Sequence, residues 1–250
     1  MRLSGRIALI TGASRGLGAA VARRFAQEGA HALLLARTIG DLEAVDDAIR
    51  AGGAETTLVP LDLTDGAAID RLTAPLRERF GRLDILVGNA AVLGRLTPLA
   101  HYPPDLWREV FAVNLDANWR LIRALDPLLR AAPAGRAIFV TSGITRRIAA
   151  YWGAYAASKA ALESLVTTYA AEVAGSNLRV NLINPGPTRT RMRALAFPGE
   201  DPATLPPPEA LTEAFVALAE PACARHGQVV SARDWIAQAA PTPLNARSAP

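Results

Sequence analysis

The chain has 250 residues, of which half are hydrophobic and a fifth are charged, a composition typical of one compact domain with a large core. Its formal net charge of +4 comes from arginines spread through every segment, without a block of like charge or an arginine-aromatic stripe, which argues against nucleic-acid binding. The single cysteine, Cys223, excludes an internal disulfide framework and a multi-cysteine metal site, and it indicates a reducing compartment.

Targeting and metal-binding signals are also missing from the sequence. The N-terminus lacks the long apolar region of a secretory signal, and no apolar run is long enough to span a bilayer. The three histidines, His31, His101 and His226, lie far from one another and from acidic clusters. We therefore expect a cytoplasmic protein that binds no metal and does not associate with a membrane.

Short apolar runs alternate with helical patterns along the chain, which is typical of βαβ units around a parallel sheet. Strands are predicted at residues 6–11, 31–36, 56–61, 83–87, 136–141, 179–183 and 228–231. Helices are predicted at residues 17–28, 41–51, 64–80, 104–130, 151–174 and 209–219, while the prolines of residues 198–208 are expected to break any long element.

These elements define the fold class as α/β, with a doubly wound, mostly parallel sheet of about seven strands and helices on both faces, in three layers. We expect one domain over residues 1–235. Residues 236–250 are rich in Ala, Pro and Thr and have little to bury, so a mobile C-terminal tail is predicted there.

A glycine-rich loop follows the first predicted strand and leads into the first predicted helix. Gly12 permits a tight turn, Gly16 lets a ligand approach the backbone, and Gly18 allows the helix to pack closely on the strand. Unpaired N–H groups and the positive end of the helix dipole would face this loop, which suits a pyrophosphate. We therefore predict a dinucleotide site that includes Gly12, Ser14, Arg15, Gly16, Leu17 and Gly18.

Charges near the end of the second strand bear on which dinucleotide is bound. An acidic residue at this point would accept hydrogen bonds from the ribose 2′-hydroxyl of NAD and would repel the 2′-phosphate of NADP. The chain instead has Ala36, followed by Arg37, and it carries Arg15 in the glycine loop. Two cations without a carboxylate predict a preference for NADP(H) over NAD(H).

Lys159 is the only lysine among 27 lysines and arginines, and it lies four residues after Tyr155. On a helix the two side chains share a face. A nearby positive charge favours phenolate, and it lowers a tyrosine pKa from about 10 toward the range in which the phenol exchanges protons. The same spacing also arises by chance, so it gains weight only beside other motifs.

Taken together, these motifs give a sequence that resembles the short-chain dehydrogenase/reductase family over residues 5–231. The match continues with Asp62 after the third strand, Asn89-Ala90 after the fourth, and Asn114 in the long helix. It ends with Ser142, thirteen residues before Tyr155, and an Asn-Pro-Gly run at residues 184–186. The resemblance implies a Rossmann-like oxidoreductase that transfers hydride between NADP(H) and a carbonyl or secondary alcohol substrate, working as a homodimer or homotetramer.

The resemblance also implies a role for each matching residue. Tyr155 would act as general acid and base, Ser142 would hold the substrate oxygen, and Lys159 would hydrogen-bond the nicotinamide ribose. Asn114 would carry a water that connects Lys159 to solvent, although a polar residue that satisfies a kink in a long helix is an equally good interpretation. Besides the glycine loop and Arg37, the implied cofactor contacts are Asp62, Leu63, Asn89, Ala90, Tyr155, Lys159, Pro185, Gly186 and Thr188.

Two departures from the family pattern stand out. The usual Asn-Asn-Ala-Gly stretch is Gly-Asn-Ala-Ala at residues 88–91, and the segment after Thr188 is short and rich in proline. Two alternative functions stay open, a 3-oxoacyl thioester reductase and a non-catalytic regulatory protein that binds NADP(H). The presence of Ser142, Tyr155 and Lys159 disfavours the second, because a pure binder has no use for the phenol and ammonium pair.

Overall fold

The structure is a computed structural model and describes residues 1–147 and 149–239. Within these residues, seven strands form one sheet in the order β3-β2-β1-β4-β5-β6-β7, and every neighbouring pair is parallel. The predicted sheet is confirmed, and it is wholly parallel. The strands are β1 (Ile7–Thr11), β2 (His31–Ala36), β3 (Thr56–Pro60), β4 (Ile85–Gly88), β5 (Arg136–Val140), β6 (Arg179–Asn184) and β7 (Val229–Ser231).

The order of the strands indicates where a binding site would lie. From β1 the chain builds outward to β2 and β3, then returns to the other side of β1 with β4. At such a reversal, the connections after the two central strands run in opposite directions and leave a crevice at the carboxyl ends of the strands. The glycine loop follows β1 and Asn89 follows β4, so both lie at this crevice.

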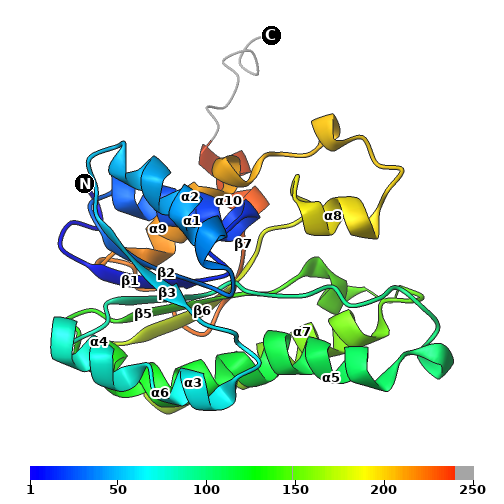
Figure 1. Cartoon of the computed structure of the whole chain (residues 1–250), viewed down its shortest axis with the longest axis horizontal. Helices are drawn as coiled ribbons and strands as arrows, with labels where there is room; N and C mark the ends of the chain where they lie inside the picture. Colours follow the sequence, from blue (N-terminus) through cyan, green and yellow to red (C-terminus); the bar gives the residue numbers. More distant parts are fainter. Residues whose placement is uncertain (148, 240–250) are drawn as a thin grey trace, which may run out of the picture.

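Helices cover both faces of the sheet (Figure 1). One face carries α1 (Gly16–Gln27), α2 (Ile39–Arg50), α9 (Thr212–Ala219) and α10 (Ala232–Ala239). The other carries α3 (Gly66–Asp70), α4 (Thr73–Phe80), α5 (Pro104–Phe111), α6 (Ala117–Ala131) and α7 (Gly153–Val173). A further short helix, α8 (Arg191–Ala196), lies to one side of the sheet, and 3-10 turns occur at Leu99–His101, Gly143–Arg146, Pro202–Thr204 and Pro208–Leu211.

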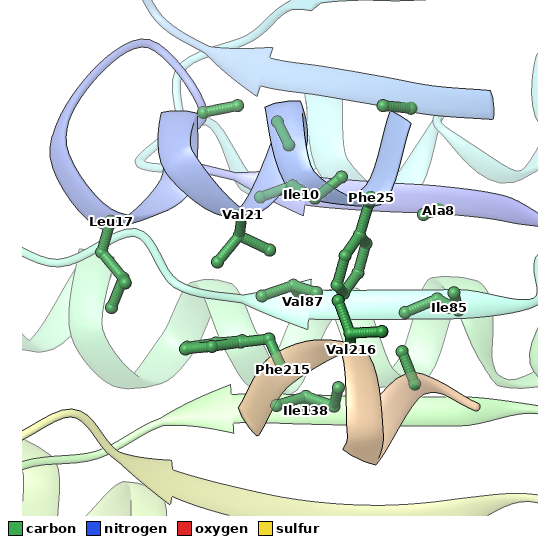
Figure 2. Close-up of a cluster of buried hydrophobic side chains, with 14 of the residues drawn as sticks. Ala8, Ile10, Leu17, Val21, Phe25, Ile85, Val87, Ile138, Phe215 and Val216 are labelled. Atoms are coloured by element: carbon green, nitrogen blue, oxygen red, sulfur yellow. The ribbon is translucent and has the colours of Figure 1, made fainter. Parts of the chain in front are cut away.

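The sheet is buried on both faces, which is why its strands are continuously apolar. On the side of α1 and α9, Phe25 and Phe215 pack over strand residues such as Val87 and Ile138 (Figure 2). A second cluster of buried leucines and valines from α4, α6 and α7 fills the opposite face. Burying one such side chain contributes about 1.5–3 kcal/mol, so the two clusters hold the loops at the strand ends in place.

The long helix predicted over residues 104–130 is present, with one irregularity. Between α5 and α6 the backbone forms a π-helical segment, Ala112–Asp116, and Asn114 lies inside it. Such single π turns are frequently found at functional sites.

The helix predicted over residues 64–80 begins as expected, because Asp65 caps α3 by accepting a hydrogen bond from the N–H of Ala68 at 2.9 Å. It then divides into α3 and α4. At the division, the Thr73 hydroxyl donates to the carbonyl oxygen of Ala124 in α6 at 2.5 Å. This contact comes from a distant segment, which a local sequence pattern does not reveal.

Further elements differ from the prediction. Helix α7 begins at Gly153 and not at residue 151, because Tyr151 has φ of +73°, a left-handed value that a right-handed helix excludes. Helix α8 was not predicted, and it begins where the Thr190 hydroxyl accepts a hydrogen bond from the N–H of Arg193 at 3.2 Å. Helix α10 extends through Ala239, so it includes residues 236–239 of the predicted tail, and residues 240–250 lie outside the described residues.

Candidate active site

A cavity of about 690 Å³ lies at the carboxyl ends of the strands. Its walls come from segments that follow each of β1 to β6, as the crevice at the strand reversal requires. The volume lies within the range usual for small-molecule and cofactor sites. The predicted cofactor residues that line it are Gly12, Ser14, Arg15, Gly16, Leu17, Arg37, Asp62, Leu63, Asn89, Ala90, Tyr155, Lys159, Pro185, Gly186 and Thr188.

The glycine loop has the geometry that its sequence predicts. Gly12 and Gly16 have φ of +64° and +55°, values that a side chain makes unfavourable. Gly18 does not line the cavity, and a Cβ there would lie 2.2 Å from the carbonyl oxygen of Gly12, so its role is close packing. The first turn of α1 has neither a capping side chain nor an acidic residue. Its N–H groups are therefore free to bind an anion, which fits a pyrophosphate.

Asn89 fixes this loop from the neighbouring strand. Its side-chain Nδ2 donates to the carbonyl oxygen of Thr11 at 2.9 Å. In return, the Thr11 hydroxyl accepts hydrogen bonds from the N–H groups of Asn89 at 2.9 Å and Ala90 at 3.0 Å. Thr11 was not among the predicted site residues, although its position directly before Gly12 at a strand end was a usable signal. The contact couples the ends of β1 and β4.

The part of the cavity formed by the segments after β2 and β3 is polar. One carboxylate oxygen of Asp62 accepts hydrogen bonds from the Thr64 N–H and hydroxyl, both at 2.8 Å. Those bonds, with a smaller effect from the Arg37 charge, lower the pKa of Asp62. Arg15 and Arg37 line the cavity and are exposed. Asp41 also lines it and was missed by the sequence argument, which considered only the strand end.

Another part of the cavity brings together Ser142, Tyr155 and Lys159. Ser142 follows β5, whereas Tyr155 and Lys159 lie one turn apart on α7, and all three line the cavity. Lys159 is 1% exposed, and its Nζ donates to the carbonyl oxygen of Val140 at 2.8 Å. The same Nζ lies 6.0 Å from the centre of the Tyr155 ring.

Burial dominates the ionisation of both α7 groups. It lowers the pKa of Lys159 to about 8. It also raises the pKa of Tyr155, and a hydrogen bond with Ser142 opposes that rise. The expectation that Lys159 lowers the pKa of the phenol is therefore wrong for this arrangement, because removal from water disfavours the charged form of each group.

Asn114 is buried and does not line the cavity. Its Oδ1 accepts from the N–H of Val92 at 2.8 Å, and its Nδ2 donates to the Val92 carbonyl oxygen and to the Ser158 hydroxyl, both at 3.0 Å. Ser158 in turn donates to the carbonyl oxygen of Tyr155 at 2.8 Å. Asn114 thus links the π-helical segment to the helix of Tyr155, in line with the interpretation as a polar residue at an irregular helix. Its role in carrying water stays a prediction.

The proline-rich segment after Thr188 forms part of the site. Trp152 lies between Tyr155 and Phe197, with ring centres 5.9 and 5.6 Å away. The Arg193 guanidinium stacks 3.7 Å from the centre of the Phe197 ring and makes two hydrogen bonds of 2.6 Å with Glu200. Met192, Arg193 and Ala196 line the cavity, so α8 forms part of its wall.

Two kinds of feature are absent from the part of the chain that the structure describes. Across residues 1–147 and 149–239, no three His, Cys, Asp or Glu side chains gather closely enough to hold a metal ion. No helix in the same part of the chain combines the length and apolar character needed to cross a membrane.

The sequence matches known proteins over most of its length. The family model described as short chain dehydrogenase matches residues 6–201. The "Uncharacterized oxidoreductase YciK" of Escherichia coli K12 is 41% identical over 209 residues, which is 82% of each chain.

Two further relatives are described by the cofactor that they bind or depend on. A short chain dehydrogenase from Shigella flexneri 2a, solved in complex with NADP, is 37% identical, has a TM-score of 0.90 and covers 93% of this chain and 98% of its own. The "Uncharacterized NAD-dependent oxidoreductase Rv0687" of Mycobacterium tuberculosis is 37% identical over 206 residues, 76% of this chain and 74% of its own. With its fold, glycine loop and matching relatives, the chain belongs to the short chain dehydrogenase family of oxidoreductases.

Proposed function

We propose that the protein transfers hydride between NADP(H) and a carbonyl or secondary alcohol, with Tyr155 as general acid and base. The observation that carries this proposal is the convergence of Ser142, Tyr155 and Lys159 on one cavity. The same cavity is lined by the glycine loop and by Pro185 and Gly186. The loop proposed to bind the phosphates and the proposed proton donor therefore line the same cavity.

The residues present fit a dinucleotide. The left-handed glycines and the uncapped first turn of α1 suit its pyrophosphate, and Arg15 and Arg37 would meet a 2′-phosphate. The relative that contains NADP supports this choice, whereas Asp41 and the relative named NAD-dependent weigh against it. When bound, NADPH supplies the hydride for reduction.

The remaining chemistry belongs to the chain's own side chains. The Ser142 hydroxyl donates a hydrogen bond to the substrate oxygen, and Tyr155 gives up its phenol proton as negative charge develops on that oxygen. A positioned proton donor of this kind accelerates a reaction by about 10²- to 10⁴-fold. Because burial raises the pKa of Tyr155, the phenol keeps its proton at neutral pH until the substrate oxygen takes it. Lys159 would hydrogen-bond the nicotinamide ribose.

The test is a panel of ketones, aldehydes, 3-oxoacyl thioesters and secondary alcohols, assayed through NADPH absorbance with NADH in parallel. We expect turnover of at least one simple carbonyl, faster with NADPH. Turnover of thioesters alone would favour the 3-oxoacyl thioester reductase. NADPH binding without any turnover would favour the non-catalytic binder.

We also propose that the protein is a homodimer or homotetramer in the cytoplasm. The support is the family resemblance, by which the two long helical segments, residues 104–130 and 151–174, pair across a subunit interface; Trp119 in the first of them is 44% exposed. Sedimentation at micromolar concentration should give a dimer or tetramer, and a monomer would contradict this part of the proposal.

A further inference from the structure

A third polar residue continues the pattern of Tyr155 and Lys159 along α7. Glu163 lies four residues after Lys159, so it falls on the same face of the helix. Its Oε1 accepts a hydrogen bond from the Thr141 hydroxyl at 2.7 Å and another from the Thr145 hydroxyl at 2.9 Å. These two threonines lie on either side of Ser142 in the sequence.

The segment from Thr141 to Thr145 is also held by internal hydrogen bonds. The N–H and the hydroxyl of Thr145 both lie within hydrogen-bond distance of the Ser142 carbonyl oxygen, at 3.2 and 3.0 Å. One turn earlier on α7, Lys159 holds the carbonyl oxygen of Val140. Two side chains of α7 therefore hold the end of β5 and the turn that carries Ser142.

Glu163 itself is well placed to hold this turn and poorly placed to react. Its side chain is 16% exposed and it does not line the cavity. A carboxylate oxygen accepts two hydroxyl donors at once, and charge-assisted hydrogen bonds of this kind are about twice as strong as neutral ones. The ion pair of Glu163 with the largely exposed Arg146, at 3.7 Å, adds little by comparison.

We propose that Glu163 is a positioning residue, which sets the Ser142 hydroxyl opposite Tyr155 by anchoring Thr141 and Thr145. Its effect on turnover rests on the proposed function, because that function gives Ser142 its role. Its effect on the position of Ser142 does not depend on any substrate.

Two substitutions separate the hydrogen bonds from the charge. Glu163→Gln keeps an oxygen that accepts both hydroxyls, whereas Glu163→Met keeps the length and removes the acceptor. Glu172→Ala is the matched control, since it removes a carboxylate from an exposed position on the same helix. If Glu163→Met fails to fold, Thr141→Val combined with Thr145→Val removes the same two hydrogen bonds from the other side.

Crystal structures of these variants with NADPH bound give the first readout. In Glu163→Met we expect the Ser142 hydroxyl to move away from Tyr155 or to lose its single position, and in Glu163→Gln and Glu172→Ala to stay in place. An unmoved Ser142 in Glu163→Met overturns the proposal. This result stands even if no carbonyl is turned over, which would count against the proposed function alone.

Kinetics with a carbonyl that the wild type reduces give the second readout. Glu163→Met should lower kcat roughly 10- to 100-fold, as a misplacement of about 1 Å at a reacting group does. Its dissociation constant for NADPH should stay unchanged, and Glu163→Gln should restore most of the rate. An equal loss in Glu163→Gln and Glu163→Met, or weakened NADPH binding in proportion to the loss of rate, contradicts a positioning role.

Discussion

Lys159 and Tyr155 lie one helical turn apart, with the ammonium 6.0 Å from the centre of the phenol ring and its hydrogen bond directed to the carbonyl oxygen of Val140. The two side chains are buried together, and burial shifts their pKa values in opposite directions. In both cases burial favours the neutral form of the side chain. At neutral pH the phenol therefore keeps its proton, beside a lysine whose pKa is lowered to about 8.

The first prediction concerns the pKa of Lys159. Because this is the only lysine of the chain, protein labelled with [13Cε]lysine gives a single lysine resonance. We expect that resonance to titrate near pH 8 in the cofactor-free protein, where burial places its pKa. A titration near pH 10.5, the ordinary value for a solvated lysine, contradicts the burial described above.

The second prediction follows by linkage. Between about pH 8 and 10.5 the unfolded chain keeps the Lys159 proton while the folded protein has lost it, so the unfolded state binds more protons. Stability of the wild type should therefore rise with pH across this window relative to Lys159→Met, by about 3 kcal/mol at most. Urea unfolding of both proteins at several pH values measures the difference. Parallel curves would show that Lys159 titrates alike in both states.

A third prediction tests the glycine loop. In Gly18→Ala the new Cβ meets the carbonyl oxygen of Gly12 at 2.2 Å and the Asn89 Nδ2 at 2.6 Å, so the backbone must move. We expect a loss of roughly 1–3 kcal/mol in stability, typical of overpacking, together with weaker NADPH binding. Gly40→Ala in α2 is the control, because its Cβ meets nothing within 4 Å. It should be neutral or stabilising by about 0.5–1 kcal/mol, and similar behaviour of the two variants would contradict the clash.

A fourth prediction concerns the 2′-phosphate. Arg37→Ala should raise the dissociation constant of NADPH roughly 10- to 100-fold, since a hydrogen bond to a charged group contributes about 1.5–3 kcal/mol. The dissociation constant of NADH should change little. Fluorescence titration of both cofactors measures the ratio, with Arg50→Ala, outside the cavity, as control. An equal loss for NADPH and NADH would place Arg37 away from the 2′-phosphate.

Features that depend on local sequence were predictable. The parallel strands are buried on both faces and read as apolar runs, so their positions were found within two residues. The left-handed glycines were found because the loop lies between a strand and a helix. The pairing of Tyr155 with Lys159 follows from helical spacing, whereas the place of Ser142 beside them was implied by the family resemblance.

Features that depend on contacts between distant segments were not predictable from the sequence. The contact of Thr11 with Asn89 joins residues 78 apart, and that of Glu163 with Thr141 joins residues 22 apart. The pKa of Tyr155 was predicted in the wrong direction, because helical spacing shows a neighbouring charge but not the depth of burial. Helix α8 has only six residues among prolines, too few for a periodic pattern.

Tyr155→Phe tests most directly whether Tyr155 delivers the proton. The change removes one hydroxyl and keeps the ring, and Tyr151→Phe, at an exposed tyrosine, is the control. With NADPH and a carbonyl that the wild type reduces, we expect Tyr155→Phe to lower kcat by about 10²- to 10⁴-fold. Its NADPH dissociation constant should stay close to that of the wild type. Turnover of Tyr155→Phe at a rate near that of the wild type would contradict the assignment.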